Sequence, residues 1–554
     1  MVGFVFRLLI PVLAVSLAAQ NPDIKERRLG NGFQVLLAER PGTGAVHARL
    51  VVRAGRADTG ALPAMAAELL ARTLFRRIGQ ADLSPENNLE MLLKQEEGAL
   101  EALRLERARR FRMHLAEPAG EEQGLAQLHA ARLGEVRARL ATDSPVDLLE
   151  ALGATRREVV TDADAISFRL DLPLASFAPW CRLEQQQLQR LILSRFALER
   201  EAWKEELAKG AQSEGEALSI LLGTAFSGHP YAQVFEARPS WLDGFSWSEL
   251  RAYARAILSP ERLTLILVGD LRMESALPVL QGTFGALPTG PTAFGRHLEF
   301  SGDALTGPGY RRLQASTAGD PRLFMGWRIP PASHPDYLAL KVLAQGLGGS
   351  RLPRKLQETK GLAKHLSVRL GVPGGRDASL LLIDATPAEG HGLAELEEAL
   401  HSEMLRVQNE RFTEEDLRRA QRQVEAEQLR AQDDATTLAE ALGVAVAQSG
   451  DWQQAFRAKN AGHDLSPDEI QVVARRYLVS SQGITALLEA DPLLAPRDPL
   501  EGRLAKVLTT LVQRKVDDPA QAESVVRETL RQLRMLSVPE REQTLKLLEA
   551  QGKP

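Results

Sequence analysis

The sequence has 554 residues, several times the usual domain length, so roughly three to five compact units are expected. Apolar residues make up 44% of the chain and charged residues 25%, while the formal net charge is -4. This ordinary composition does not suggest a nucleic-acid partner. The single cysteine, Cys181, excludes an intramolecular disulfide and a cysteine-rich metal site.

Residues 1–19 have the layout of a secretory signal peptide. Arg7 is followed by an apolar run from Leu8 to Ala19, which ends in small residues. A membrane anchor is the alternative, but a run of about twelve apolar residues is short of the roughly 20 that span a bilayer. No later segment is long and apolar enough to be transmembrane. We therefore expect an exported protein, periplasmic or extracellular.

Residues 22–288 are predicted to form a first α+β domain. Two strands flank the turn at Pro41 and Gly42, and apolar residues alternate along the second strand. A helix is expected from Leu62 to Arg77, because its apolar positions recur at helical spacing. Further on, a strand ends at Pro173 and two helices follow, then a polar loop containing HPYAQVF, another helix and the β-like run LTLILVGD.

Residues 84–143 interrupt this domain with a different pattern. Leucines recur near heptad spacing amid dense mixed charge, and Glu96 breaks the repeat. The breaker at Pro118 separates a second helical stretch from the first, which predicts an antiparallel helical hairpin. Such a hairpin could be a solvated pair of surface helices or a surface for a partner.

Residues 289–308 are rich in proline and glycine and form the best candidate linker. Residues 309–490 then repeat the order of strands and helices of the first domain. A duplicated α+β chain, with a sheet flanked by helices in each half, is the simplest account. The tail, residues 491–554, is expected to be helical and is assigned no function.

Six strings in the correct order carry a resemblance to the insulinase and pitrilysin metallopeptidases, in particular to their two-domain exported bacterial members. They cover about residues 25 to 490 and read RRLGNGFQVLLAER, LVVRAGRADTG, LEREAWKEEL, HPYAQVF, RLTLILVGD and GLGGSRLPRKLQETKGLAKHLSV. The resemblance implies the duplicated α+β fold. More distantly, the chain is similar to the subunits of the mitochondrial processing peptidase.

Members of this family hold zinc on a helix with an inverted His-x-x-Glu-His motif, completed by a glutamate from a later helix. Matching the flanking leucines and phenylalanine places this motif on residues 68–72. Glu68 then stands at the first histidine, Ala71 at the general base and Arg72 at the second histidine. Glu206 matches the distal glutamate, although it is also simply one acid on a charged helix.

The substituted residues do not suit zinc chemistry. A guanidinium is cationic at every accessible pH and offers no lone pair to a metal, so Arg72 cannot be a ligand. Ala71 has no group that transfers protons. We expect no catalytic residue, no metal and no cofactor, and we expect Arg72 to pair with Glu206 or with Glu68.

The resemblance also implies positions that contact a peptide. Relatives present an asparagine on a strand at the place of Glu158, and an arginine and a tyrosine at the places of Arg351 and Lys364. Arg351 is the one retained candidate, and it could equally be an arginine at a helix start that pairs with a nearby acid.

These features predict a non-catalytic homologue that pairs with an active family member and holds peptides or unfolded protein segments. Processing peptidases of the family divide the work in this way, so the pairing is an analogy. Two alternatives stay open. One is an active zinc peptidase with an unusual ligand set built on Glu68 and Glu206, and the other is a solitary peptide-binding scaffold.

Overall fold

The structure is a computed structural model of the chain. The part it describes comprises residues 23–75, 79, 83, 88–113, 120–142, 147–208, 213–289, 310–317, 320–456, 465–490, 493, 499–516, 518–534 and 536–551. The expected signal peptide and nearly all of the expected linker lie outside these residues.

The first half of the chain forms a six-stranded sheet with helices, and its strands lie in the order β1-β2-β6-β3-β5-β4. The strands are β1 (Ile24–Arg28), β2 (Gln34–Glu39), β3 (Ala45–Val52), β4 (Thr155–Thr161), β5 (Ile166–Pro173) and β6 (Leu263–Gly269). The helices are α1 (Met65–Phe75), α2 (Leu89–Arg112), α3 (Gly120–Thr142), α4 (Leu148–Ala151), α5 (Phe177–Arg190), α6 (Phe196–Ala208), α7 (Ser213–Ala225), α8 (Pro239–Leu242), α9 (Trp247–Ile257) and α10 (Met273–Gly282).

The second half forms a five-stranded sheet in the order β7-β11-β8-β10-β9. The strands are β7 (Arg311–Thr317), β8 (Arg322–Ile329), β9 (Ala363–Val372), β10 (Ser379–Pro387) and β11 (Ile484–Ala490). The helices are α11 (Tyr337–Gly346), α12 (Leu393–Asn409), α13 (Glu414–Asp433), α14 (Ala435–Ser449) and α16 (Pro467–Tyr477).

The two sheets share one topology. In each half the last strand inserts into the sheet, parallel to one early strand and antiparallel to the next: β6 lies between β2 and β3, and β11 lies between β7 and β8. Strands β4 and β9 lie at one edge of their sheets, and β1 and β7 lie at the opposite edges. The predicted duplicated α+β fold, with a helical hairpin in the first half, is therefore confirmed.

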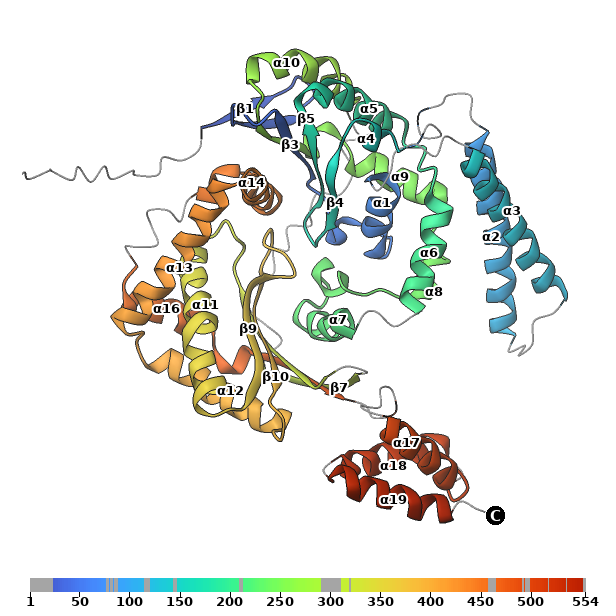
Figure 1. The fold of residues 1–554 in the computed structure, drawn as a ribbon, viewed down its shortest axis with the longest axis vertical. Coiled ribbons are helices and arrows are strands. Elements are labelled where there is room, and N and C mark those ends of the chain that lie inside the picture. The colour runs from blue at the N-terminus through green and yellow to red at the C-terminus, as the bar shows by residue number, and fades with distance from the viewer. Residues whose placement is uncertain are drawn as a thin grey trace, which may run out of the picture.

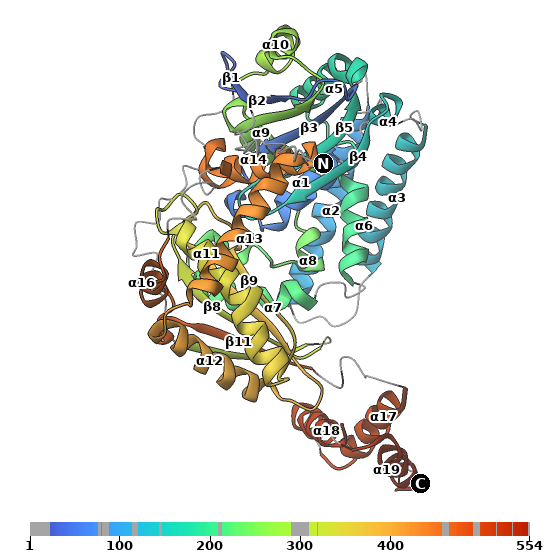
Figure 2. The same cartoon turned by 60° about the vertical axis from the view of Figure 1, so that its left-hand side comes forward.

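Each half covers one face of the other half's sheet with a helix. Helix α7 of the first half packs on β11, β7 and β8, and helix α14 of the second half packs on β3 and β6. Figures 1 and 2 show α14 beside the first sheet and α7 beside the second. The contacts are apolar: Leu221 of α7 lies in one cluster with Phe324 of β8, and Leu442 of α14 lies in another with Ile266 of β6.

Helix α7 corrects one prediction. The stretch before HPYAQVF was expected to be part of a polar loop, but residues 213–225 form a helix. Its leucines, among them Leu218, Leu221 and Leu222, are buried only because they meet the sheet of the other half. Local periodicity could not reveal that partner.

Helices α2 and α3 form the predicted hairpin, and part of it is packed rather than solvated. Leu89 and Leu93 of α2 join the main core of the first half. Glu96 does not interrupt this face, contrary to the expectation, because it is fully buried and its carboxylate accepts a hydrogen bond from Arg200 of α6 at 2.5 Å. His129 of α3 contacts the same carboxylate oxygen at 2.8 Å. A buried ion pair thus joins both hairpin helices to α6.

We expect Arg200→Met to lower the free energy of unfolding by about 3 to 5 kcal/mol, because it leaves the buried charge of Glu96 without its cation. The double variant Glu96→Leu, Arg200→Met removes both charges and is expected to recover most of this loss. Urea denaturation followed by circular dichroism checks both. Equal destabilisation by the single and the double variant would contradict the ion pair's role.

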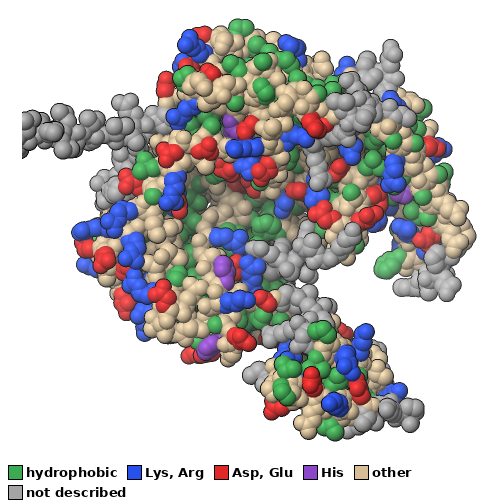
Figure 3. All heavy atoms as spheres, in the orientation of Figure 1, with side chains coloured by type: hydrophobic (Ala, Val, Ile, Leu, Met, Phe, Trp, Pro, Cys, Tyr) green, Lys and Arg blue, Asp and Glu red, His purple; other side chains and the backbone are tan. Residues whose placement is uncertain are grey.

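The tail forms three helices, α17 (Pro499–Gln513), α18 (Pro519–Leu533) and α19 (Val538–Gln551), with a small core of their own. Arg531 of α18 pairs with Glu489 of β11 at 2.8 Å, which connects the tail to the second half (Figure 3). Within the described part of the chain, no helix combines the length and the apolar character that crossing a membrane requires.

Candidate functional site

Helix α1 presents only two residues to solvent. Glu68 and Arg72 are half-buried and lie one turn apart, while the other nine residues of the helix are buried in the core of the first half. Residues four apart share a helix face, so both side chains point the same way. This is the face on which relatives are expected to carry their histidines.

Arg72 lies between two carboxylates. Its Nε donates to Glu68 at 3.2 Å, and its Nη1 donates to Glu206 of helix α6 at 2.9 Å. The sequence predicts one or the other of these ion pairs, and the structure has both. Arg56 also pairs with Glu68, at 3.0 Å, and the Arg72 guanidinium stacks over the ring of Trp203 with 4.8 Å to its centroid.

The electrostatics of this site favour the charged forms. Burial lowers the pKa of Arg72, but the hydrogen bond to Glu206 and the charge of Glu68 more than offset it, so the pKa is raised above its ordinary value. Arg72 is a permanent cation here. Because a guanidinium has no lone pair to offer, the arginine occupies with positive charge the place where a metal would need a donor.

The residues present therefore do not fit a catalytic zinc site. Two carboxylates, Glu68 and Glu206, are already engaged by arginine, and no imidazole stands on either helix. Ala71 is buried at the position of the general base and cannot transfer a proton. Among the described residues, no cluster of three or more histidine, cysteine, aspartate and glutamate side chains has the geometry of a metal site.

The second half has a counterpart of this site. Helices α11 and α13 occupy the places of α1 and α6 in the repeated order of elements, and they too are joined by polar side chains. Gln345 of α11 donates to Gln423 of α13 at 3.2 Å. An amide pair thus stands in the second half where an ion pair stands in the first.

Glu158 lies on β4, an edge strand of the first sheet. Its carboxylate pairs with Arg169 of the neighbouring strand β5 at 2.6 Å, and Arg169 also pairs with Glu440 of helix α14. The side chain is therefore part of a network that reaches the other half. Because β4 has a free edge, an extended peptide could still pair with its backbone beside Glu158.

The other two candidate peptide-contact residues lie in the second half and have local partners. Arg351 pairs with Glu410 at 3.0 Å and lies over the ring of Phe412, at 5.6 Å from the centroid. Lys364, on the edge strand β9, is 70% exposed, and its Nζ lies 3.7 Å from Asp320. The structure thus shows the arginine paired with a nearby acid, and the lysine accessible to solvent.

A buried junction joins the two halves, and it was not predicted from the sequence. Asp164, 2% exposed, accepts hydrogen bonds from the Tyr231 hydroxyl at 2.5 Å and from the backbone N–H groups of Gly375 and Arg376 at 2.7 and 3.0 Å. Arg376 in turn pairs with Asp58 of the first half at 3.1 Å. Asp164 and the HPY string were visible in the sequence, but nothing in it showed that they meet.

We expect Asp164→Ala to lower the free energy of unfolding by about 2 to 4 kcal/mol, because three buried donors lose their acceptor. Limited proteolysis near residues 373–377 should become faster. Asp162→Ala tests specificity, since Asp162 caps only its own turn at Asp164 and Ala165. Equal effects of both variants on proteolysis there would contradict a junction held by Asp164.

Three of the described histidines have structural partners. His229 accepts a hydrogen bond from the backbone of Tyr231 at 3.1 Å, and His129 contacts Glu96 in the hairpin. His47 on β3 pairs with Asp171 on β5. Three further histidines, His114, His297 and His463, lie outside the described residues.

The geometry is that of a duplicated metallopeptidase-like fold whose expected metal ligands are replaced. Residues 245–424 match the family model described as "Peptidase M16 inactive domain". A search of curated proteins finds no match. The match covers less than half of the chain, and it supports the resemblance to the insulinase and pitrilysin metallopeptidases that the sequence carries.

Solved structures support the same fold. A protease from Helicobacter pylori is 16% identical with a TM-score of 0.64, over 85% of this chain and 100% of that chain. A peptidase M16 inactive domain from Pseudomonas fluorescens is 14% identical with a TM-score of 0.62, over 84% and 98%. The periplasmic protease PqqL from Escherichia coli is 14% identical with a TM-score of 0.56, over 88% of this chain but 49% of PqqL. At these identities the likeness concerns the fold alone.

Proposed function

We propose that this protein is an exported, non-catalytic M16 homologue that binds peptides or unfolded protein segments together with an active family member. We infer the absence of catalysis from the position of Arg72, whose guanidinium lies within 3.2 Å of both Glu68 and Glu206. A cation held by the two acids leaves no place for zinc, and Ala71 offers no base.

The pairing is supported by size. The chain corresponds to 49% of PqqL, a larger protein of the same fold, so a second chain of similar size would complete a comparable body. An active partner would supply a zinc helix with its histidines.

Export is supported by Arg7 and the apolar run from Leu8 to Ala19. The name of PqqL describes that protein as periplasmic. Both observations support the proposal that the protein works outside the cytoplasm.

The test of pairing is affinity purification of the tagged chain from its native host. We expect one co-purifying protein with an intact His-x-x-Glu-His motif in equal amount. Added to that partner, this chain should increase chelator-sensitive cleavage of an unstructured peptide, mainly by lowering KM. Recovery of the chain as a lone monomer, with no effect on the partner's KM, would overturn the pairing.

The test of inactivity is independent. The purified chain alone should not cleave the peptide at any added zinc concentration. Cleavage that a chelator abolishes and that Glu206→Ala removes would overturn this part of the proposal and favour an enzyme with unusual ligands.

A further inference from the structure

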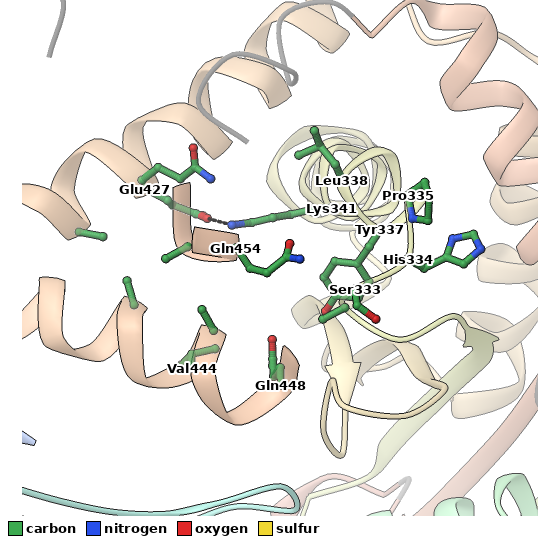
Figure 4. A pocket seen from close by; sticks show the side chains of 16 residues that line it. Ser333, His334, Pro335, Tyr337, Leu338, Lys341, Glu427, Val444, Gln448 and Gln454 are labelled. Atoms are coloured by element: carbon green, nitrogen blue, oxygen red, sulfur yellow. Dashed lines mark ion pairs between the residues drawn. The ribbon is translucent and has the colours of Figure 1, made fainter. Parts of the chain in front are cut away.

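A cavity of about 630 Å³ lies in the second half, between helices α11, α13 and α14 and the short helix at Trp452–Phe456. It is distinct from the site at Arg72, which lies on α1 and α6 of the first half. The volume is within the range of about 300 to 1,000 Å³ that is typical of ligand sites. Figure 4 shows the side chains that line it.

The walls of the cavity are mostly carbon. Small side chains create the space on α13 and α14, where larger residues would fill it, and α11 adds two larger apolar surfaces. These residues are Ala431, Ala441, Val444, Ala445, Tyr337 and Leu338. Val444 is 41% exposed although it is apolar. An apolar side chain of a ligand would be favourably buried against these walls.

Three amide side chains, Gln428, Gln448 and Gln454, line the cavity, and Ser333 and His334 add a hydroxyl and an imidazole. The Oε1 atom of Gln428 is buried, and no hydrogen-bond partner for it is found in the part of the chain that the structure describes. A buried acceptor without a donor costs free energy, so this atom points to a ligand that brings an N–H group. Amides both donate and accept, as the groups of a peptide backbone do.

The charges at the cavity balance each other. Lys341 of α11 and Glu427 of α13 face one another with 3.7 Å between Nζ and Oε2. Because the pair is neutral overall, the site does not call for a charged ligand. Carbon walls, amide groups and a neutral pair together match an uncharged peptide segment with an apolar side chain.

We propose that this cavity, named here the α11–α14 pocket, binds one apolar side chain of an unfolded peptide and hydrogen-bonds the adjacent backbone through Gln428. The inference rests on the proposed function, since it names the part of the peptide that this chain holds. It adds a specificity-determining site in the second half, away from the edge strand β4.

The experiment measures fluorescence anisotropy with the purified chain and three labelled, unstructured decapeptides that differ only at one central residue. That residue is glycine, leucine or phenylalanine. We expect the leucine and phenylalanine peptides to bind at least about tenfold tighter than the glycine peptide, because only they fill the apolar walls.

Ala431→Phe and Ala441→Phe fill the pocket from different helices and should reduce all three peptides to the affinity of the glycine peptide. Arg422→Phe adds the same ring at an exposed position of α13 outside the pocket and should leave the preference unchanged. Gln428→Leu keeps the side-chain volume and should weaken the binding of all three peptides by a similar factor, about five- to tenfold. Circular dichroism and melting temperature report whether each variant is folded.

Several outcomes would overturn the proposal. These are equal affinity for the glycine and leucine peptides, no measurable binding of any peptide, or a preference that persists in both folded pocket-filling variants. A stoichiometric small organic molecule released on denaturation, or self-association lost in Ala431→Phe, would assign the pocket to another occupant. Capture of an active relative with unaltered peptide preference would retain the pairing and reject the pocket.

Discussion

The triple variant Glu68→His, Ala71→Glu, Arg72→His is expected to bind one zinc ion per chain, with a dissociation constant on the order of 1 µM or tighter, about 8 kcal/mol. The reason is geometric. Residues 68 and 72 already share the exposed face of α1, and Glu206 already lies 2.9 Å from the side chain at position 72. Two imidazoles one turn apart and a carboxylate would complete a three-ligand site with an open position. The stoichiometry is measured by metal analysis after dialysis.

Two controls make this result specific. The unaltered chain should retain no stoichiometric zinc, and adding Glu206→Ala to the triple variant should weaken its zinc binding at least about tenfold. Zinc bound by the unaltered chain and lost in Glu68→Ala would contradict the interpretation of the Arg72 site. Failure of the folded triple variant to bind zinc would show that α1 and α6 do not have the geometry of a metal site.

The second large effect concerns the free energy of unfolding and Glu184, a residue that is not part of the Arg72 site. Glu184 of helix α5 is fully buried, and no hydrogen-bond partner for either of its carboxyl oxygens is found among the described residues. Burial raises the pKa of Glu184 to about 8. We expect Glu184→Gln to raise the free energy of unfolding by roughly 3 kcal/mol at pH 7.

The sign follows from the two pKa values. In the unfolded chain the carboxyl has its ordinary pKa of 4.5, and in the folded chain it keeps its proton up to about pH 8. The part of the cost that comes from ionisation is therefore absent below pH 4.5, and stability falls progressively as the pH rises from there to 8. Glutamine stays neutral, so the gain of the variant should grow over this interval. Urea denaturation at several pH values measures it.

Glu205→Gln is the matched control, because Glu205 is exposed on α6. It should change stability little at any pH. A gain for Glu184→Gln that is the same at pH 5 and pH 8 would show that titration of the carboxyl is not its cause.

Much of the fold could be predicted because it repeats. The order of strands and helices appears twice, and the alternation in β3 and the helical spacing in α1 are local signals that tertiary contacts reinforce. The role of α7 could not be predicted, because its leucines meet a sheet more than a hundred residues away in sequence. For the same reason Glu96 resembled a break in a heptad pattern, although Arg200 neutralises it.

The site at α1 was accessible to sequence reasoning because the three residues follow a motif with fixed spacing. Glu68 and Arg72 are four residues apart on one helix, so their contact follows from helix geometry alone. The junction at Asp164 and the α11–α14 pocket depend on loops and helices that meet only in three dimensions. No spacing in the sequence encodes that Gly375 donates to Asp164, or that Ala431 and Ala441 face a common space.

Helices α7 and α14, which each pack on the sheet of the other half, determine where a peptide could enter this protein. Each helix packs on the sheet of the other half. Separating the halves would therefore expose two apolar surfaces to water at once. Apolar contacts therefore hold the two halves together. If the chain encloses a peptide together with a partner, the peptide must enter along the interface between the two chains. The rate of entry would then respond to protein concentration and to the lifetime of that association, rather than to a hinge within this molecule.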